Sequence, residues 1–507
     1  MPEEIELKLS APADVLPAVR AHPAVAAIAR GPAKTTRMVS TYYDTPKRDL
    51  AAAGVALRLR RAGRRWLQTV KGAGNAAAGL HRRAEFEWPV AAPRLDPGKL
   101  AETPWRKLFA RNSGAYKRVF ATDVRRSEFD LAFADGTRAT LCVDVGEIRA
   151  GRRRAPVSEI EVELEQGDPS RLFELASALA ADLPVRVLHA SKAERGYALA
   201  ARAPIAPRRA RDVVPAPDAS PQAALAAIAG DCIAQVEINA AGMLATTNPE
   251  YLHQLRVGWR RLRSLLKLAA LLVPAGRIDP LEQELRTLGS VLGPARDCDV
   301  FALETLPKVA AEFRGDRNIA RLRARAAARR RRLSPLARNA VATSQFQQLL
   351  LALGAFFAAL GRPPTDAPAA SLARDWIQPI LEERHRKLRK RAKHVHRVGA
   401  AERHRARVAA KKLRYAAEFF APLFPGKRAD TYVTALSKLQ SALGRLNDLE
   451  VAAKLTGELA PRDDVDAGAA HASGVVRGWL AASLAPELKR LRDAQRAFRK
   501  CAPFWQA

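Results

Sequence analysis

Two hydrophobic periods divide this sequence and limit what it can fold into. Up to about residue 200, short runs such as EIELKLS, VALRLRR and SEIEVELEQG alternate polar with apolar residues, between glycine, proline and Asp-Gly turns. This period of two predicts an antiparallel sheet or barrel with a few helices. Beyond residue 221, long segments rich in Ala, Leu and Arg repeat with helical spacing, which predicts a nearly all-helical second half.

A proline-rich stretch separates the two halves. Prolines crowd the segment APIAPRRARDVVPAPDASP, where neither a helix nor a sheet continues easily. We therefore predict an N-terminal domain over residues 1–203, a linker over 204–221 and a helical domain over 222–507. The predicted fold class is α+β multidomain, with an antiparallel β-barrel flanked by helices followed by an all-α duplicated helical bundle.

The formal net charge of +33 favours a polyanionic partner. Nucleic acid, an anionic membrane and a phosphate polymer are the candidates, and charge alone does not choose among them. No apolar run reaches the roughly eighteen residues that a membrane span needs, so we predict a cytoplasmic protein without a membrane partner. The four cysteines lie far apart without a CxxC pair, which indicates neither a disulfide framework nor a zinc site.

The strands of the first half carry charges on one face. Glu4, Glu6 and Lys8 share one side of EIELKLS and alternate with apolar residues on the other side. A solvent-facing strand would explain any one of these runs, but the mixture of acids and bases in several strands favours a closed barrel with a charged interior. Carboxylates bind hard divalent cations, and Arg and Lys bind phosphate oxygens. A site with both suits a metal-bound polyphosphate.

The second half contains an internal repeat. At a constant offset of 151 residues, seventeen of the forty-nine positions from 253 to 301 are identical without a gap. This duplication predicts two similar helical bundles. His253, Arg256, Arg260, Arg263 and Lys267 form a stripe along one helix face, and a second copy recurs as His404, Arg407, Lys411 and Arg414. One basic stripe is typical of a solvated helix, whereas its recurrence favours anion binding.

The strand motifs resemble the CYTH superfamily, the triphosphate tunnel metalloenzymes. EIELK matches the ExExK signature, and STYYDTP, ALRLR, TVKG, RAEFE, TDVRRSEF, VDVGE, SEIEVEL and SKAERGYAL follow in the expected order over about residues 3–200. The resemblance implies a barrel closed around its substrate and a Mg²⁺ or Mn²⁺ cofactor. The implied catalytic and metal-binding residues are Glu4, Glu6, Asp144, Glu159, Glu161 and Glu163. The implied triphosphate-binding residues are Lys8, Arg58, Arg60, Lys71, Arg83, Arg126 and Lys192, with Glu85 and Glu87 serving the metal or the network that orients the bases.

The activity implied by this resemblance is metal-dependent hydrolysis of inorganic triphosphate. Two alternatives stay open. CYTH relatives also act on thiamine triphosphate or cyclise ATP, and the protein could instead bind polyphosphate or nucleic acid without turnover.

The helical motifs HQLRVGWRRLR and HRARVAAKKLRY resemble the CHAD domain, a module that binds inorganic polyphosphate. Ser264 stands in the first copy where the second has Tyr415. The implied polyphosphate-binding residues are His253, Arg256, Arg260, Arg263, Lys267, His404, Arg407, Lys411, Lys412 and Arg414. Such binding should weaken with salt and strengthen as the pH falls through the histidine range, and it implies association with polyphosphate granules. The stripes hold few aromatic residues for base stacking, which argues against nucleic acid.

Overall fold

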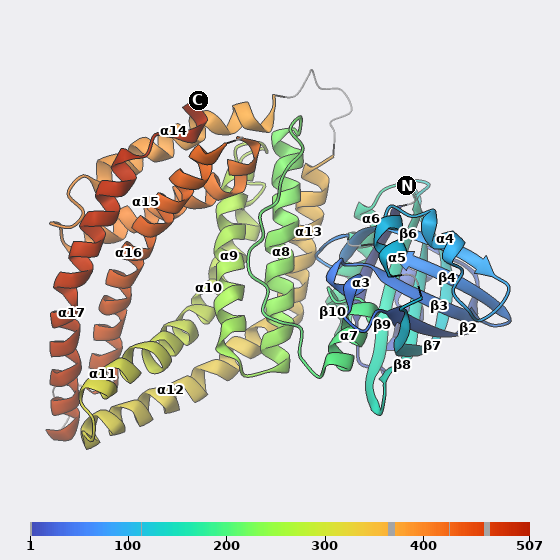
Figure 1. Ribbon diagram of the computed structural model, residues 1–507, viewed down its shortest axis with the longest axis horizontal. Helices are drawn as coiled ribbons and strands as arrows, with labels where there is room; N and C mark the ends of the chain where they lie inside the picture. The colour runs from blue at the N-terminus through green and yellow to red at the C-terminus, as the bar shows by residue number, and fades with distance from the viewer. Residues whose placement is uncertain are drawn as a thin grey trace. The chain divides into compact units, whose positions relative to one another are not determined.

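The computed structural model of the chain describes residues 3–72, 74–112, 114–362, 371–424, 426–460 and 467–506 (Figure 1). Two compact units are present. The first comprises Met1–Arg209, Gly230–Thr247 and Ala342–Ala359, and the second comprises Ala210–Ala229, Asn248–Val341 and Leu360–Ala507.

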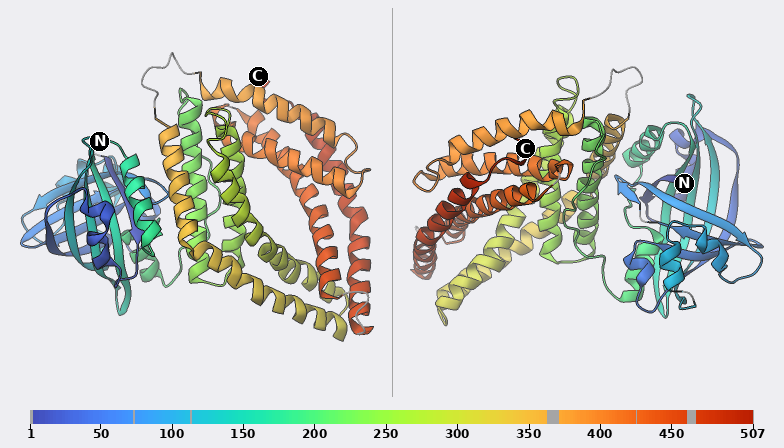
Figure 2. Two further views of the ribbon diagram at one scale, coloured as in Figure 1. Left: turned by 180° about the vertical axis from the view of Figure 1, so that it is seen from behind. Right: turned by 45° about the horizontal axis from the view of Figure 1, so that its top comes forward.

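Within the described part of the first unit, eight antiparallel strands close into a barrel (Figure 2). In ring order they are β1 (Glu3–Ser10), β9 (Arg153–Gln166), β8 (Arg138–Ala150), β7 (Lys117–Ala132), β2 (Ala29–Asp44), β3 (Ala56–Ala62), β4 (Arg65–Lys71) and β6 (Leu80–Val90), which pairs with β1. Two short strands, β10 (Arg186–Val187) and β5 (Asn75–Ala77), pair with β1 and β6. The predicted antiparallel barrel is confirmed.

Strand alternation separates a charged interior from an apolar exterior. An apolar cluster that includes Leu57 and Val70 lies between the strands β3 and β4 and the residues Leu50, Leu100 and Phe109. These last three belong to the helices α3 (Asp49–Ala52), α4 (Pro97–Ala101) and α5 (Arg106–Arg111). Helix α6 (Ser170–Asp182) contacts β1, whose outward Leu7 and Leu9 are fully buried. Two short helices, α1 (Leu16–Ala21) and α2 (Pro23–Ala26), lie between β1 and β2.

Helix α7 (Lys192–Ala201) packs against one part of the barrel interior. A capping box between Ser191 and Glu194 starts the helix. Its Tyr197 packs edge-on against the ring of Phe120. A Cβ atom at Gly196 would lie 2.1 Å from that same ring, so the close approach requires glycine. The helix therefore delivers its N-terminal Lys192 to the charged residues of the interior.

The rest of the chain is helical. The helices are α8 (Pro221–Ala245), α9 (Pro249–Ala269), α10 (Asp279–Val300), α11 (Leu306–Glu312), α12 (Arg317–Ala342), α13 (Ser344–Leu360), α14 (Ala373–Ala392), α15 (Ala400–Phe420), α16 (Lys427–Leu459) and α17 (Ala467–Lys500), with short turns of other helix types at Phe301–Thr305, Ala421–Leu423 and Phe504–Gln506. Helices α9 and α15 begin and end 151 residues apart, and Pro335 in α12 recurs at the same offset as Pro486 in α17. The predicted all-helical second half is confirmed, and its elements follow the repeat in the sequence.

The two compact units do not follow the order of the linker and the helices along the sequence. Residues 203–216 carry no regular secondary structure, and α8 begins at Pro221. Part of α8 and most of α13 belong to the same compact unit as the barrel. Among the described helices, α8 alone is long and apolar enough to span a membrane by length and composition, and 72% of its most apolar window is buried in the protein.

Candidate metal and phosphate sites

The opening strand places its charges inside the barrel. In β1, Glu4 lies opposite Arg83 of β6, and Lys8 lies opposite Glu161 of β9. The ammonium of Lys71, from β4, donates to both carboxylate oxygens of Glu4 at 2.8 and 2.9 Å. Because β4 and β1 are not neighbours in the sheet, their side chains meet across the interior. The expected inward orientation of the charged face is therefore what the structure has.

Lys8 and the glutamates around it form a buried ion-pair network. The Lys8 ammonium lies 2.9 Å from Glu6 and 2.5 Å from Glu161, and Arg83 bonds to Glu6 as well as to Glu4. Glu6 and Lys8 are 1% and 4% exposed. Burial would raise the pKa of Glu6, but Lys8 and Arg83 hold it below its usual value. Each of these charges is thus maintained by its partners.

A second network is built around Arg126 and Lys192. The guanidinium of Arg126 makes a bidentate pair with Asp144, at 2.8 Å for each bond, and also bonds to Glu161. Lys192 lies 2.8 Å from Asp144, 2.7 Å from Glu159 and 2.8 Å from Glu161. Burial would raise the pKa of Glu161, but Lys192, Lys8 and Arg126 lower it well below its usual value.

Strands β3, β4 and β6 supply a more loosely paired set of charges. Arg58 lies 3.5 Å from Glu85 and 3.9 Å from Glu87, and Thr69 donates to Glu87 at 2.8 Å. Burial and the charges of Arg58 and Arg126 lower the pKa of Arg60. Among the described residues, the buried Nε atoms of Arg58 and Arg60 have no hydrogen-bond partner. These two guanidiniums are donors that an anion would satisfy.

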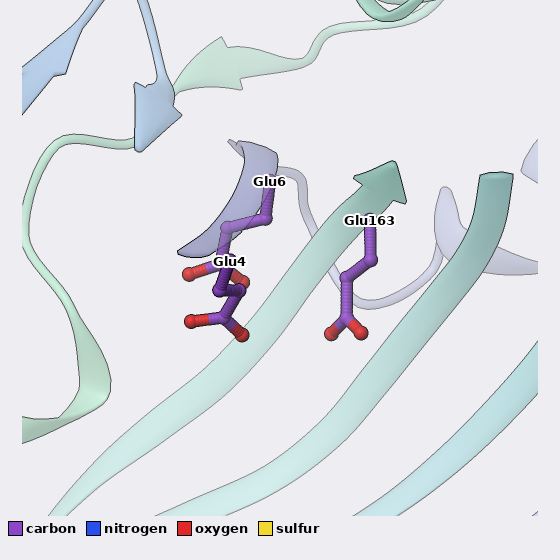
Figure 3. A group of neighbouring side chains, drawn as sticks. All are labelled: Glu4, Glu6 and Glu163. Carbon is purple, nitrogen blue, oxygen red and sulfur yellow. The ribbon is translucent and has the colours of Figure 1, made fainter. Parts of the chain in front are cut away.

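Three of the predicted metal ligands come together. One carboxylate oxygen each from Glu4, Glu6 and Glu163 lies within 4.8 Å of the others, and Figure 3 shows the three carboxylates approaching from β1 and β9. The pairing of Glu6 with Glu163 in the two strands explains this proximity. Burial and the charges of Glu161 and Glu6 raise the pKa of Glu163, although Arg126 opposes them. Three carboxylate oxygens this close together suit a hard divalent cation such as Mg²⁺ or Mn²⁺, and the neighbouring bases Lys8, Lys71 and Arg83 now neutralise Glu4 and Glu6.

The other three predicted metal ligands, Asp144, Glu159 and Glu161, lie in the Lys192 network. Each of them is at most 2% exposed and is engaged by basic side chains. The structure thus separates the six predicted acids into Glu4, Glu6 and Glu163, whose oxygens lie close enough to share a cation, and three acids that pair with Lys192.

Two interior residues received no role from the sequence. Tyr42 accepts a 3.5 Å hydrogen bond from Arg58 and stacks on Phe120, and Arg195 bonds to Glu159 and to the carbonyl of Pro156. Tyr42 belongs to the STYYDTP motif, and Arg195 follows Lys192 by three residues on α7, so the helical spacing signals a second inward base.

In the second unit, the two basic stripes face one another across α9 and α15. The central residues are Arg256 and Arg260 of α9 with Arg407 and Lys411 of α15. Burial, followed by the charges of the three arginines, lowers the pKa of Lys411 to about 7. The Nε atoms of Arg256 and Arg407 are buried and lack a hydrogen-bond partner among the described residues, although Arg407 donates to Asn447 through another nitrogen.

The remaining stripe residues are less concentrated. Lys267 is exposed and pairs with Glu282 at 3.4 Å. Burial, and then the charge of Lys267, lower the pKa of Lys412, which is also largely exposed. His404 is exposed as well. Burial and Arg296 lower the pKa of the half-buried His253.

Two further arginines differ in their engagement. Arg414 bonds to Gln440 and Glu418, which reduces its availability to an anion. Arg263 is half-buried, and its Nε has no partner among the described residues. The structure therefore gathers four of the ten predicted residues at the centre of the two stripes.

Comparison with known families agrees with these two parts. Residues 2–197 match the CYTH domain family and residues 227–457 match the CHAD domain family. The chain therefore carries a CYTH domain followed by a CHAD domain, as the sequence motifs predicted.

One curated relative is the inorganic triphosphatase of Haemophilus influenzae, which is 31% identical over 165 residues. The match covers 32% of this chain and 46% of that protein, so the chain spans about half the length of this relative. The crystal structure of the CHAD domain from the plant Ricinus communis is 35% identical, with a TM-score of 0.51, and covers 58% of this chain and 97% of that one. A putative adenylyl cyclase from Hippeastrum with a dominant triphosphatase activity is 20% identical, covering 38% of this chain and 95% of that one, with a TM-score of only 0.29.

Proposed function

We propose that the barrel hydrolyses inorganic triphosphate with Mg²⁺ or Mn²⁺ as cofactor. The observation that carries this proposal is the juxtaposition of the Glu4, Glu6 and Glu163 carboxylates with a barrel interior lined by bases. The likeness to an inorganic triphosphatase supports the same substrate. A divalent cation bound by the three glutamates would neutralise charge on the phosphate oxygens and position the attacking water.

The bases of the interior bind the phosphates in this proposal. The buried Nε atoms of Arg58 and Arg60 have no partner in the part of the chain that the structure describes, and phosphate oxygens are suitable acceptors for guanidinium groups. The remaining bases are Lys8, Lys71, Arg83, Arg126 and Lys192. Their carboxylate partners orient them until the substrate arrives. Burial opposes the charged form of Lys8 and Lys192, but the neighbouring carboxylates raise the pKa of both.

We also propose that the helical domain binds inorganic polyphosphate through Arg256, Arg260, Arg407 and Lys411. Four clustered cations that Asp297 and Asp448 compensate only in part are unfavourable on their own, and a polyanion relieves the repulsion. Burial, and then the charges of the three arginines, lower the pKa of Lys411 to about 7, so the arginines contribute to this repulsion. The cytoplasmic location and the association with polyphosphate granules stay predictions.

Phosphate release from triphosphate, with and without Mg²⁺ or Mn²⁺, tests the proposed activity. We expect turnover only with the metal, and we expect the double variant Glu4→Gln/Glu6→Gln to lose it. Glu147→Gln is the matched control, because Glu147 of β8 pairs with Arg149 and Arg154 away from this cluster. Metal-independent turnover or an active double variant would remove the proposed site.

The same assay separates the candidate substrates. Thiamine triphosphate and ATP are compared with triphosphate at equal concentration, and ATP products are inspected for the cyclic nucleotide. Faster turnover of thiamine triphosphate or of ATP than of triphosphate would overturn inorganic triphosphate as the substrate.

Competition between labelled polyphosphate and single-stranded RNA, at one fixed salt concentration, tests the helical domain. We expect polyphosphate to displace RNA. The opposite result would assign the basic cluster to nucleic acid.

A further inference from the structure

A short turn behind Lys8 is held by helices that lie far away in the sequence. Ala78 and Gly79 join β5 to β6, and both have positive φ angles of 51° and 75°. Ala78 is fully buried. The backbone N–H of Lys8 donates to the carbonyl of Gly79 at 2.9 Å, and a Cβ atom on Gly79 would lie 2.8 Å from the Lys8 carbonyl oxygen. The turn therefore presses against the backbone of an interior base.

Helix α8 binds this turn through a buried carboxylate. Glu237, 5% exposed, accepts a 3.1 Å hydrogen bond from the backbone N–H of Gly79. Its second oxygen lies 3.0 Å from Nδ1 of His189. A buried carboxylate is costly unless it is hydrogen-bonded, so both contacts contribute to the placement of the turn.

Helix α13 closes over the same turn. A Cβ atom on Gly354 would lie 2.3 Å from Cβ of Ala78 and 2.6 Å from the ring of Phe173, so only glycine permits this approach. The segments of α8 and α13 that belong to the barrel unit run alongside each other in the views of Figures 1 and 2. The positive φ of Ala78 is unfavourable for a residue with a side chain and is stabilised by this packing.

The other backbone group of Lys8 is tied to the helices in a similar way. Its carbonyl accepts a 3.0 Å hydrogen bond from Leu188, and the preceding Val187 N–H donates to Gln347 of α13 at 3.0 Å. The backbone of Lys8 is thus hydrogen-bonded to Gly79, which Glu237 binds, and to Leu188, whose neighbour Val187 is bound by Gln347.

The two histidines near the turn complete this arrangement. His81 lies 3.2 Å, through Nε2, from the Leu188 carbonyl, which can only accept, and its ring centroid is 6.0 Å from that of His189. Burial and the charge of Lys8 lower the pKa of His81 to about 3, so it is a neutral donor beside the Lys8 ammonium.

We propose that Glu237 and Gln347 are positioning residues for the reaction in the barrel, acting through the backbone of Lys8. This inference rests on the proposed triphosphatase activity. The helical segments that follow the linker would then complete a site whose charged groups all come from the N-terminal domain.

Steady-state kinetics of full-length variants test this proposal. We expect Glu237→Ala to lower kcat for triphosphate about tenfold or more, and Glu237→Gln, which keeps an acceptor for Gly79, to stay within about threefold of the wild type. Asp231→Ala is the matched control, because Asp231 is another buried acid of α8 and pairs with Arg208. Gln347→Ala provides an independent variant if Glu237→Ala does not fold.

A double-mutant cycle separates positioning from general destabilisation. In a Lys8→Met background, Glu237→Ala should have no further effect on kcat, because Lys8 is the group it positions. Additive losses, an equal loss in Asp231→Ala, or kcat within twofold of the wild type in both Glu237→Ala and Gln347→Ala would overturn the inference.

Amide hydrogen exchange gives a readout that does not need turnover. The Lys8 and Leu188 amides should exchange faster in Glu237→Ala than in Asp231→Ala. If the wild type is inactive but shows this exchange pattern, the triphosphatase proposal is rejected and the positioning of the Lys8 backbone by Glu237 is retained. If exchange at Lys8 and Leu188 is unchanged in Glu237→Ala, the positioning role is rejected.

Discussion

Arg260 of α9 donates a hydrogen bond from Nε to the hydroxyl of Tyr415 on α15, at 3.3 Å. The two residues come from different copies of the repeated motif. Tyr415 occupies the position where the first copy has Ser264, and Arg260 occupies the position where the second copy has Lys411. The departure between the copies therefore has a structural consequence: a hydroxyl from one copy orients a guanidinium of the other.

Tyr415→Phe should weaken polyphosphate binding about fivefold. The change removes the acceptor for Arg260 while keeping the buried ring, and a typical hydrogen bond contributes about 1 kcal/mol net. Titration calorimetry with polyphosphate of defined length measures the effect. Tyr432→Phe is the control, because Tyr432 bonds to His385 among buried aromatic rings. Equal affinities of Tyr415→Phe and the wild type would contradict the orienting role of the hydroxyl.

Polyphosphate affinity should rise as the pH falls through about 7. Lys411 faces Arg407 on its own helix, Arg256 and Arg260 on α9, and the partly compensating Asp448 on α16, which together with burial give it a pKa of about 7. Above this pH much of the free protein has a neutral Lys411, so binding a polyanion must take up a proton. Below it the ammonium is already present and the affinity levels off.

Lys411→Arg should remove this pH dependence, because arginine stays charged throughout the range. Lys412→Arg should retain it, since Lys412 is exposed and outside the central group. Dissociation constants measured between pH 6 and 8.5 decide the question. If the pH dependence of the affinity persists unchanged in Lys411→Arg, Lys411 is not its cause and the histidines become the candidates.

Glu163→Gln should raise the Mg²⁺ concentration required for half-maximal activity about tenfold. The variant removes one of three carboxylates within 4.8 Å of each other, and a neutral amide is a weaker ligand for a hard cation. Glu165→Gln is the control, because Glu165 lies two residues further along β9 and accepts from Thr140 near the surface. Identical metal titrations for the two variants would exclude Glu163 from the cation site.

Lys192→Met should lower the free energy of unfolding of the barrel by about 3–5 kcal/mol at pH 7, because it leaves three buried carboxylates without their shared cation. In the wild type the pKa of Glu161 is held well below 4.5, so its contribution to stability is present above about pH 4.5 and disappears as the pH falls further. The variant raises this pKa, and its loss of stability should begin at higher pH.

Urea unfolding at several pH values measures this shift. Lys99→Met, which breaks an exposed pair with Glu102, should change the free energy of unfolding by less than about 1 kcal/mol. A Lys192→Met variant as stable as Lys99→Met across the range would show that the buried network does not depend on its central ammonium.

Periodicity carried much of the prediction for this chain. The two-residue period of a strand predicted that Glu4, Glu6 and Lys8 share one face, and in the barrel this face points inward. The offset of 151 residues anticipated the equivalence of α9 and α15 to the residue at both ends. Both results depend on local geometry, which the sequence records directly.

Periodic patterns did not predict the contacts between segments that are distant in the sequence. The pairing of Glu6 with Glu163 depends on how the barrel closes, and closure decides that Glu163 joins Glu4 and Glu6 while Glu161 turns to Lys192. The association of Glu237 with Gly79 crosses 158 residues and the linker. Neither relationship leaves a periodic signal, because each is set by tertiary packing.

Among the described residues, the acids and bases assigned above to the barrel interior occur in equal number. Lys8, Arg58, Arg60, Lys71, Arg83, Arg126, Lys192 and Arg195 stand against Glu4, Glu6, Glu85, Glu87, Asp144, Glu159, Glu161 and Glu163, so their formal charges cancel. In the proposed function, an anion that binds these bases must replace their carboxylate counter-ions, as in an ion exchanger. An anion with more negative charge can replace more of these counter-ions, so triphosphate should bind the interior bases more tightly than orthophosphate does.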